Sequence, residues 1–163
     1  LDERALERPT ELRPWFVGLG RWGQGPITAV AIALAERALP LIQAHARDLY
    51  PGAQEIYAIL DPVARGQLVA YRLRALYVPF GERSRRARQG LDPRAPSPLY
   101  ALLVVERAAY LAVALQEEDL KRALVELDWV GQAALAIPRW TDALLLSELF
   151  AEVLPQLLNE GQP

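Results

Sequence analysis

The stretch SPLYALLVVERAAYLAVALQ occupies residues 97–116. Leucine, alanine and valine fill most of its positions, and Glu106 and Arg107 are its only charged residues. Ser97 followed by Pro98 is typical of a helix start, because serine caps the first turn and proline suits the first helical position. A helix that is apolar on nearly every side has to be buried. This stretch therefore predicts a central helix in an all-α fold.

A second apolar stretch, residues 27–50, carries its own charged pair at Glu36 and Arg37. Its composition again favours a buried helix, which Pro40 would kink and Pro51-Gly52 would end. Similar breaks at Asp61-Pro62, at residues 79–81 and at Pro138 delimit the remaining helices. The expected helices cover residues 27–50, 53–60, 62–78, 98–116, 117–137 and 141–159.

These elements predict a single all-helical domain over residues 1–163, a bundle or short stack of about six helices with two central apolar ones. Residues 1–26 would form an N-terminal arm and a loop rich in Trp and Gly. Residues 81–97, rich in Arg and Pro, would form a long exposed loop.

The amino-acid composition limits the kinds of fold and site that the chain can form. The chain has 163 residues, 52% of them hydrophobic and 23% charged, which suits a folded domain with its own core rather than a disordered chain. It contains no cysteine and one histidine, so thiolate or multi-histidine metal sites and disulfides are not expected, and we expect no cofactor. No signal peptide or clean apolar span is evident, because charged pairs interrupt both apolar stretches, and we expect a cytoplasmic protein without a membrane span.

Two short matches to cofactor-binding or catalytic motifs occur, but neither has the surrounding sequence that the motif requires. Residues 18–23 match the pattern GxGxxG, but no strands surround it as a dinucleotide-binding turn requires. His45 and Asp48 would share a helical face and could form a general base, yet no nucleophile motif accompanies them. We therefore expect no enzymatic activity.

The two charged pairs in the apolar stretches need partners, because burial of an unpaired charge is costly. Glu36 and Arg107 could form one bridge between the central helices, and Arg37 and Glu106 a second. Alternatively, these groups could form a polar pocket for a small ligand. In full, that pocket would comprise Glu36, Arg37, Glu106, Arg107, Tyr110 and Trp129.

Arginines cluster between residues 65 and 94, where eight of them face two acidic residues and the local charge is +6. Guanidinium groups bind carboxylates and phosphates in pairs of hydrogen bonds. The net charge of the whole chain is −2, which favours an acidic protein surface or a second copy of the chain over nucleic acid, although Tyr71, Tyr77 and Phe80 could stack on bases. A solvated loop without a partner is the competing interpretation. The candidate partner-binding residues are Arg65, Arg72, Arg74, Arg83, Arg85, Arg86 and Arg88.

The sequence thus favours a non-enzymatic helical protein–protein interaction or adaptor module that contacts an acidic partner through an arginine-rich surface. A small-molecule-binding or sensory helical bundle, with its pocket between the central helices, is the alternative.

Overall fold

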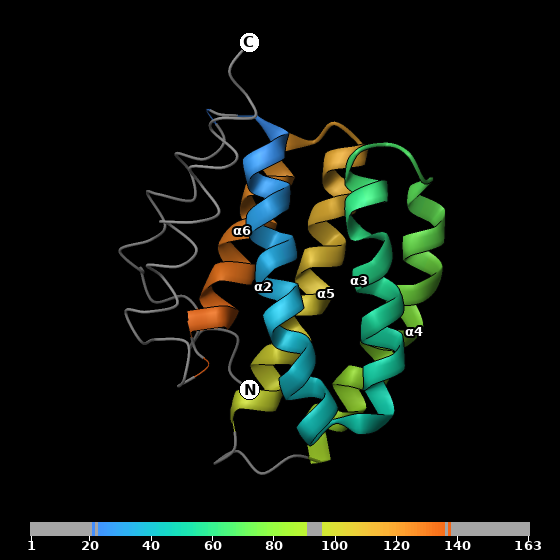
Figure 1. The fold of residues 1–163 in the computed structure, drawn as a ribbon, viewed down its shortest axis with the longest axis vertical. Coiled ribbons are helices and arrows are strands. Elements are labelled where there is room, and N and C mark those ends of the chain that lie inside the picture. Colours follow the sequence, from blue (N-terminus) through green and yellow to red (C-terminus); the bar gives the residue numbers. More distant parts are fainter. Residues whose placement is uncertain (1–20, 22, 91–95, 136, 138–163) are drawn as a thin grey trace.

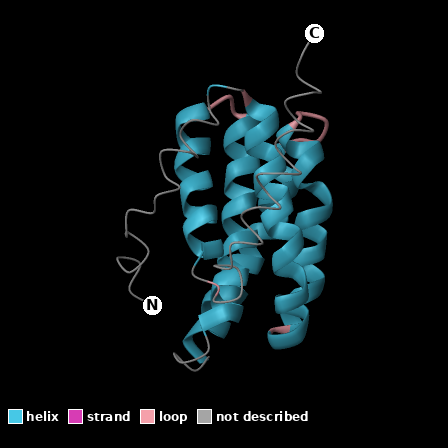
Figure 2. Cartoon of the chain, turned by 60° about the vertical axis from the view of Figure 1, so that its left-hand side comes forward, coloured by secondary structure: helices cyan, strands magenta, loops and turns pink. Residues whose placement is uncertain are grey.

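The computed structural model describes residues 21, 23–90, 96–135 and 137. These residues form five α-helices and a short 3₁₀ turn, and no strand is found among them (Figure 1). The elements are α2 (Gln24–His45), η3 (Arg47–Leu49), α3 (Tyr50–Ala64), α4 (Ala70–Gly90), α5 (Pro96–Gln116) and α6 (Leu120–Leu135). The helices run alongside one another as a bundle (Figure 2), so the expected all-α class is confirmed. The helix expected at 141–159 and most of the arm expected at 1–26 lie outside the described residues.

Helix α5 is the centre of the bundle. It packs against α2, α3, α4 and α6 (Figure 1), and its side chains from Ala101 to Glu106 and from Leu111 to Leu115 are all buried. Each leucine buried in this way stabilises the fold by about 1.5–3 kcal/mol. The absence of a polar face on α5 thus follows from its four helical neighbours.

Helix α2 packs against α5, α3 and α6, but it is less enclosed than α5. Ile27, Ala35 and Ile42 are fully buried, whereas Glu36 and Pro40 are exposed. By length and composition, α2 is the one helix among the described residues that could cross a membrane. A core helix of a bundle has the same length and composition, and the buried face of α2 covers α5.

The first two expected breaks are in the wrong places. Helix α2 ends at His45, and Pro51-Gly52 lies in the first turn of α3, where proline is well tolerated. A Cβ atom on Gly52 would lie 3.3 Å from Phe80 Cδ2, so this glycine serves the close packing of α3 on α4. Asp61-Pro62 also lies inside α3, which continues to Ala64 and is followed by Gly66 at a φ of 72°.

The loop expected at residues 81–97 is wrong over most of its length. Helix α4 continues through Pro79 to Gly90, and α5 already begins at Pro96, while residues 91–95 lie outside the described part. Proline inside a helix costs about 3 kcal/mol, because a backbone hydrogen bond is lost. Burial of Phe80 after the proline holds the second half of α4 against the bundle and offsets much of this cost.

Candidate functional site

The candidate arginines divide into paired and unpaired groups. Helix α4 lies at the edge of the bundle, packed mainly against α3 and α5 (Figure 1). Four of the seven arginines have partners within the chain. The contacts join Arg65 to Asp61 (2.8 Å), Arg74 to Glu117, Arg83 to the Asp48 carbonyl oxygen (2.6 Å) and Arg88 to Glu106 (3.7 Å).

The other three, Arg72, Arg85 and Arg86, are exposed and have no ion pair within the part of the chain that the structure describes. The expected patch of seven arginines is therefore reduced to three side chains that remain available to a partner. Their guanidinium groups keep all of their hydrogen-bond donors for solvent or for a bound carboxylate.

The solvent side of α4 is also partly apolar. Val69, just before the helix, is 63% exposed, Tyr71 is 77% exposed and Val78 is 53% exposed. By contrast, Phe80 is buried and Tyr77 is half-buried, so of the three aromatic residues considered for base stacking only Tyr71 faces solvent. We call the exposed side of the helix the outer face of α4. It comprises Tyr71, Arg72, Ala75, Val78, Glu82, Arg85, Arg86 and Gln89.

A second polar feature lies between α4 and α5, centred on Glu106. This glutamate is only 5% exposed, accepts a hydrogen bond from the Tyr110 hydroxyl (3.1 Å) and forms an ion pair with Arg88 (3.7 Å). A Cβ atom on Gly81 would lie 3.0 Å from Glu106 Oε1, so glycine is needed where α4 passes the carboxylate. Ser84 is also buried and lies on α4 between Gly81 and Arg88. We define the Glu106 cluster as Ser84, Arg88, Glu106 and Tyr110.

The environment of Tyr110 keeps its hydroxyl protonated. Burial raises the pKa of Tyr110 to about 12, and the negative charge of Glu106 and the hydrogen bond to it add to the rise. The ring of Tyr77 meets the Tyr110 ring edge to face, with centroids 4.8 Å apart. Tyr110 is therefore a hydrogen-bond donor to Glu106 at neutral pH.

Some buried polar atoms of the Glu106 cluster lack a hydrogen-bond partner among the described residues. Three of its buried atoms, Ser84 Oγ, Arg88 Nε and Glu106 Oε2, have no hydrogen-bond partner among the described residues. Buried polar atoms are almost always hydrogen-bonded to protein or to ordered water.

Arg107 points to the other side of α5, towards α6. Its guanidinium lies 3.3 Å from Glu126, 5.1 Å from the centre of the Trp129 ring and 5.5 Å from that of Tyr110. Such contacts of a cation with aromatic faces stabilise by about 0.5–2 kcal/mol. Arg107 is thus held by an ion pair and two rings.

The reciprocal bridges expected between the two apolar helices are wrong. Glu106 pairs with Arg88 and Arg107 with Glu126, because α4 and α6 also pack on α5 and present these partners. Of the six residues considered for a ligand pocket, four gather around α5, namely Glu106, Arg107, Tyr110 and Trp129. Glu36 is exposed on α2, and Arg37 beside it is half-buried. Burial of Tyr57 raises the pKa of its hydroxyl, and the negative charge of Glu36 raises it further.

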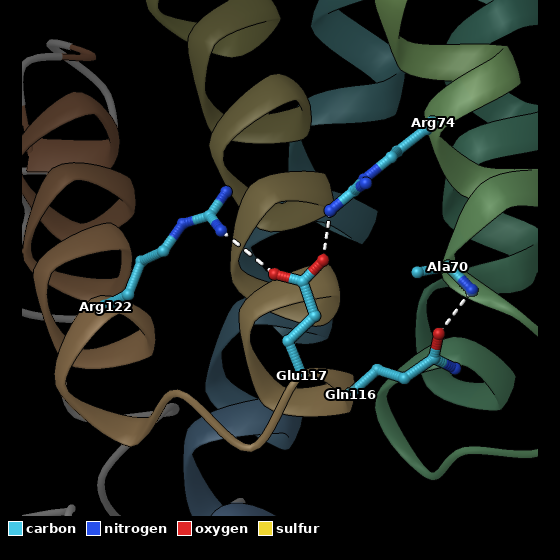
Figure 3. Close-up of polar contacts among 5 residues, drawn as sticks. All are labelled: Ala70, Arg74, Gln116, Glu117 and Arg122. Atoms are coloured by element: carbon cyan, nitrogen blue, oxygen red, sulfur yellow. Dashed lines mark hydrogen bonds and ion pairs between the residues drawn. The ribbon is translucent and has the colours of Figure 1, made fainter.

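The turn between α5 and α6 carries a contact set that the sequence did not reveal (Figure 3). Gln116 accepts a hydrogen bond from the Ala70 backbone N–H, and its amide group donates to the carbonyl oxygens of Val63 (3.1 Å) and Leu68. One side chain thereby links the end of α3 to the start of α4. An amide at the end of an apolar helix gives no signal in sequence that would have indicated this role.

Glu117, next to Gln116, joins α4 to α6 (Figure 3). Its carboxylate binds Arg74 of α4 through one oxygen and Arg122 of α6, at 3.1 Å, through the other. Residues 117–119 are exposed, and the helix expected from residue 117 starts at Leu120. Asp119 accepts a hydrogen bond from the Arg122 backbone N–H (3.0 Å).

The expected pairing of His45 and Asp48 on one helical face is also wrong. His45 ends α2, whereas Asp48 lies in η3 beyond the break, and both side chains are exposed. Among the described residues, no group of three or more His, Asp and Glu side chains could hold a metal ion.

Comparison with known proteins adds no relative. No protein-family model matches the sequence, and no curated protein or solved structure matches it either. Function is therefore inferred from the contacts, burial and charge described above.

Proposed function

We propose that this chain is a non-enzymatic helical interaction module that binds an acidic surface of a protein partner through α4. One observation above all supports this: Arg72, Arg85 and Arg86 are exposed and unpaired in the described part of the chain, while the other arginines of α4 are held by intramolecular contacts. Carboxylates from a partner would satisfy these guanidinium groups in the way that Glu117 satisfies Arg74.

The charge of α4 supports the same partner class. The helix carries six arginines and one glutamate, a net charge of +5, in a chain whose total net charge is −2. A local positive field of this kind attracts acidic surfaces and raises the rate of association, and salt weakens it. Nucleic acid is the less favoured partner, because only one of the three interleaved aromatic residues is exposed for stacking.

Charge reversal on α4 tests the proposal. The probes are a fluorescein-labelled oligoglutamate peptide and a labelled single-stranded oligonucleotide of equal charge, both followed by anisotropy at low and high salt. The chain should bind the oligoglutamate at low salt, and Arg85→Glu/Arg86→Glu should weaken binding by about tenfold or more, since both groups would repel the peptide. Lys121→Glu, an exposed charge reversal on α6, serves as the control and should change binding by less than about twofold.

Two outcomes would overturn the assignment. Absence of oligoglutamate binding at low salt would remove the acidic partner. Tighter binding of the oligonucleotide, lost in the Arg85→Glu/Arg86→Glu variant, would replace it with nucleic acid.

A second candidate function is small-molecule binding between α4 and α5, and the buried carboxylate of Glu106 with its hydrogen bond to Tyr110 and ion pair to Arg88 favours it. Ser84 and Arg88 offer hydrogen-bond donors and Glu106 an acceptor, so the ligand would be small and polar. Native mass spectrometry of the purified chain should then detect a bound small mass that Glu106→Gln releases. A bare chain under gentle conditions would overturn this candidate.

A further inference from the structure

We infer that the partner presents an acidic amphipathic helix to the outer face of α4, a conclusion that rests on the proposed function. The chemistry of this face changes along the helix: its first half presents Tyr71, Ala75 and Val78 beside Arg72, and its second half carries Arg85 and Arg86 beside Glu82. An acidic surface without apolar groups would leave the first half uncovered.

The spacing of the exposed apolar residues matches a helix–helix seam. Tyr71, Ala75 and Val78 are four and three residues apart and therefore lie on one face, and Glu82 and Arg85 continue the row at the same spacings. All five are exposed. From Tyr71 to Arg85 this row is about 21 Å long, the length of two heptads of a partner helix.

The size of the side chains along this row gives the contact a defined shape. Ala75 is small and lies between Tyr71 and Val78, which are 77% and 53% exposed, so an apolar side chain of the partner fits above Ala75. Such a knob would also cover the exposed apolar surfaces of Tyr71 and Val78.

The arginines set the charge of the partner around that seam. Arg72 flanks the apolar half, and Arg85 and Arg86 extend beyond it, so acidic residues on both sides of the knob would meet a guanidinium. A lipid surface fits less well, because only Val69, Tyr71 and Val78 could insert.

Selection from a peptide library tests this inference. The immobilised full chain is offered a phage-displayed library of random peptides of about 14 residues, two heptads long. The enriched peptides should be acidic, with apolar residues recurring at spacings of three, four and seven. The best peptide should bind Val78→Asp about tenfold more weakly or worse than the parent chain, a loss expected when a charge enters the seam.

Helix α6 provides a matched control. Val125 is 51% exposed, close to the 53% of Val78, but it lies on a different helix. Val125→Asp introduces the same charge at the same exposure and should change the affinity of the peptide by less than about twofold.

The outcomes separate this inference from the proposed function. Acidic peptides without apolar periodicity, sensitive to Arg85→Glu/Arg86→Glu but not to Val78→Asp, would overturn the helical partner and leave the acidic partner standing. Enrichment of peptides without acidic residues, or no enrichment, would overturn both.

Two further measurements test other occupants of the outer face of α4. A dimer in light scattering that Val78→Asp dissociates would show that a second copy of the chain occupies the outer face of α4. The chain could also sediment with phosphatidylserine vesicles and not with phosphatidylcholine vesicles. If Val78→Asp abolished this sedimentation, a membrane would be the occupant of the outer face of α4. Either result overturns the inference.

Discussion

The carboxylate of Glu106, deep between α4 and α5, lies 3.7 Å from the guanidinium of Arg88 and accepts a hydrogen bond from Tyr110. Arg88 belongs to the last turn of α4, beyond Pro79. This pair therefore fixes the end of the edge helix to the centre of the bundle.

Substitution of Arg88 alone should destabilise the fold more than substitution of both Arg88 and Glu106. Arg88→Met leaves the buried carboxylate of Glu106 without its cation and should lower the free energy of unfolding by about 3 kcal/mol. The double variant Arg88→Met/Glu106→Leu buries no charge and should lose less than the single variant. Urea denaturation checks both values, and strictly additive losses would show that the two groups are not coupled. Glu36→Ala, which removes an exposed carboxylate, is the control and should cost less than about 0.5 kcal/mol.

Truncation of Gln116 should loosen two helix ends together. Gln116→Ala removes the hydrogen bonds to the Ala70 N–H and to the carbonyl oxygens of Val63 and Leu68, so we expect a loss of about 2 kcal/mol. Hydrogen exchange at the Ala70 amide should rise with it. Gln54→Ala removes one exposed hydrogen bond to Tyr50 and should cost less than about 0.5 kcal/mol. An equal loss in both variants would contradict the role assigned to Gln116.

Gly81 should be intolerant of a methyl group although it lies inside a helix, where alanine is normally preferred. The added Cβ would approach Glu106 Oε1 to 3.0 Å and push the carboxylate away from Tyr110. We expect Gly81→Ala to destabilise by about 1 kcal/mol, against a usual gain of up to about 1 kcal/mol in open space. Gly90, where an added methyl group would meet nothing within 4 Å, is the comparison and should tolerate alanine. Equal stabilisation in both variants, measured by thermal unfolding, would show that α4 and α5 are not in close contact at Gly81.

Ionisation of Tyr110 should make stability fall at alkaline pH. The folded state raises the pKa of this hydroxyl from 10.0 to about 12, so between these values the unfolded chain loses the proton while the folded chain keeps it. The stabilisation is complete below pH 10 and is lost as the pH rises towards 12. Urea midpoints measured across this range should decline less in Tyr110→Phe than in the parent chain, and Tyr57 contributes equally to both. Parallel declines would contradict the buried hydrogen bond to Glu106.

The sequence was sufficient for the fold class and for the centre of the bundle. An unbroken apolar run such as residues 101–105 has no face left for solvent, which is a property of the residues themselves. Helix boundaries were less predictable, because Pro51, Pro62 and Pro79 all lie within helices. The cost of Pro79 is local, whereas the burial of Phe80 that offsets it depends on neighbours distant in sequence.

The candidate site, too, was predictable from the sequence only in part. The arginine cluster was visible as composition, but which of its members stay unpaired depends on contacts such as Arg83 with Asp48 and Arg74 with Glu117. The partner of Glu106 could not be predicted, because Arg88 was assigned to a loop rather than to a helix that reaches α5. Val78 was not singled out at all, since a single valine in a helical segment is usually buried.

The central position of α5 has a consequence for synthesis of the chain. Helices α2, α3 and α4 precede it, and each of them packs its buried face on a helix that has not yet been made. Roughly 26 residues separate Gly90 from Gln116, so at a translation rate of ~5–20 residues per second the buried face of α4 waits about 1–5 s for its cover, and those of α2 and α3 wait longer. The nascent chain therefore exposes apolar surface until α5 is made, which is the condition that favours aggregation during synthesis.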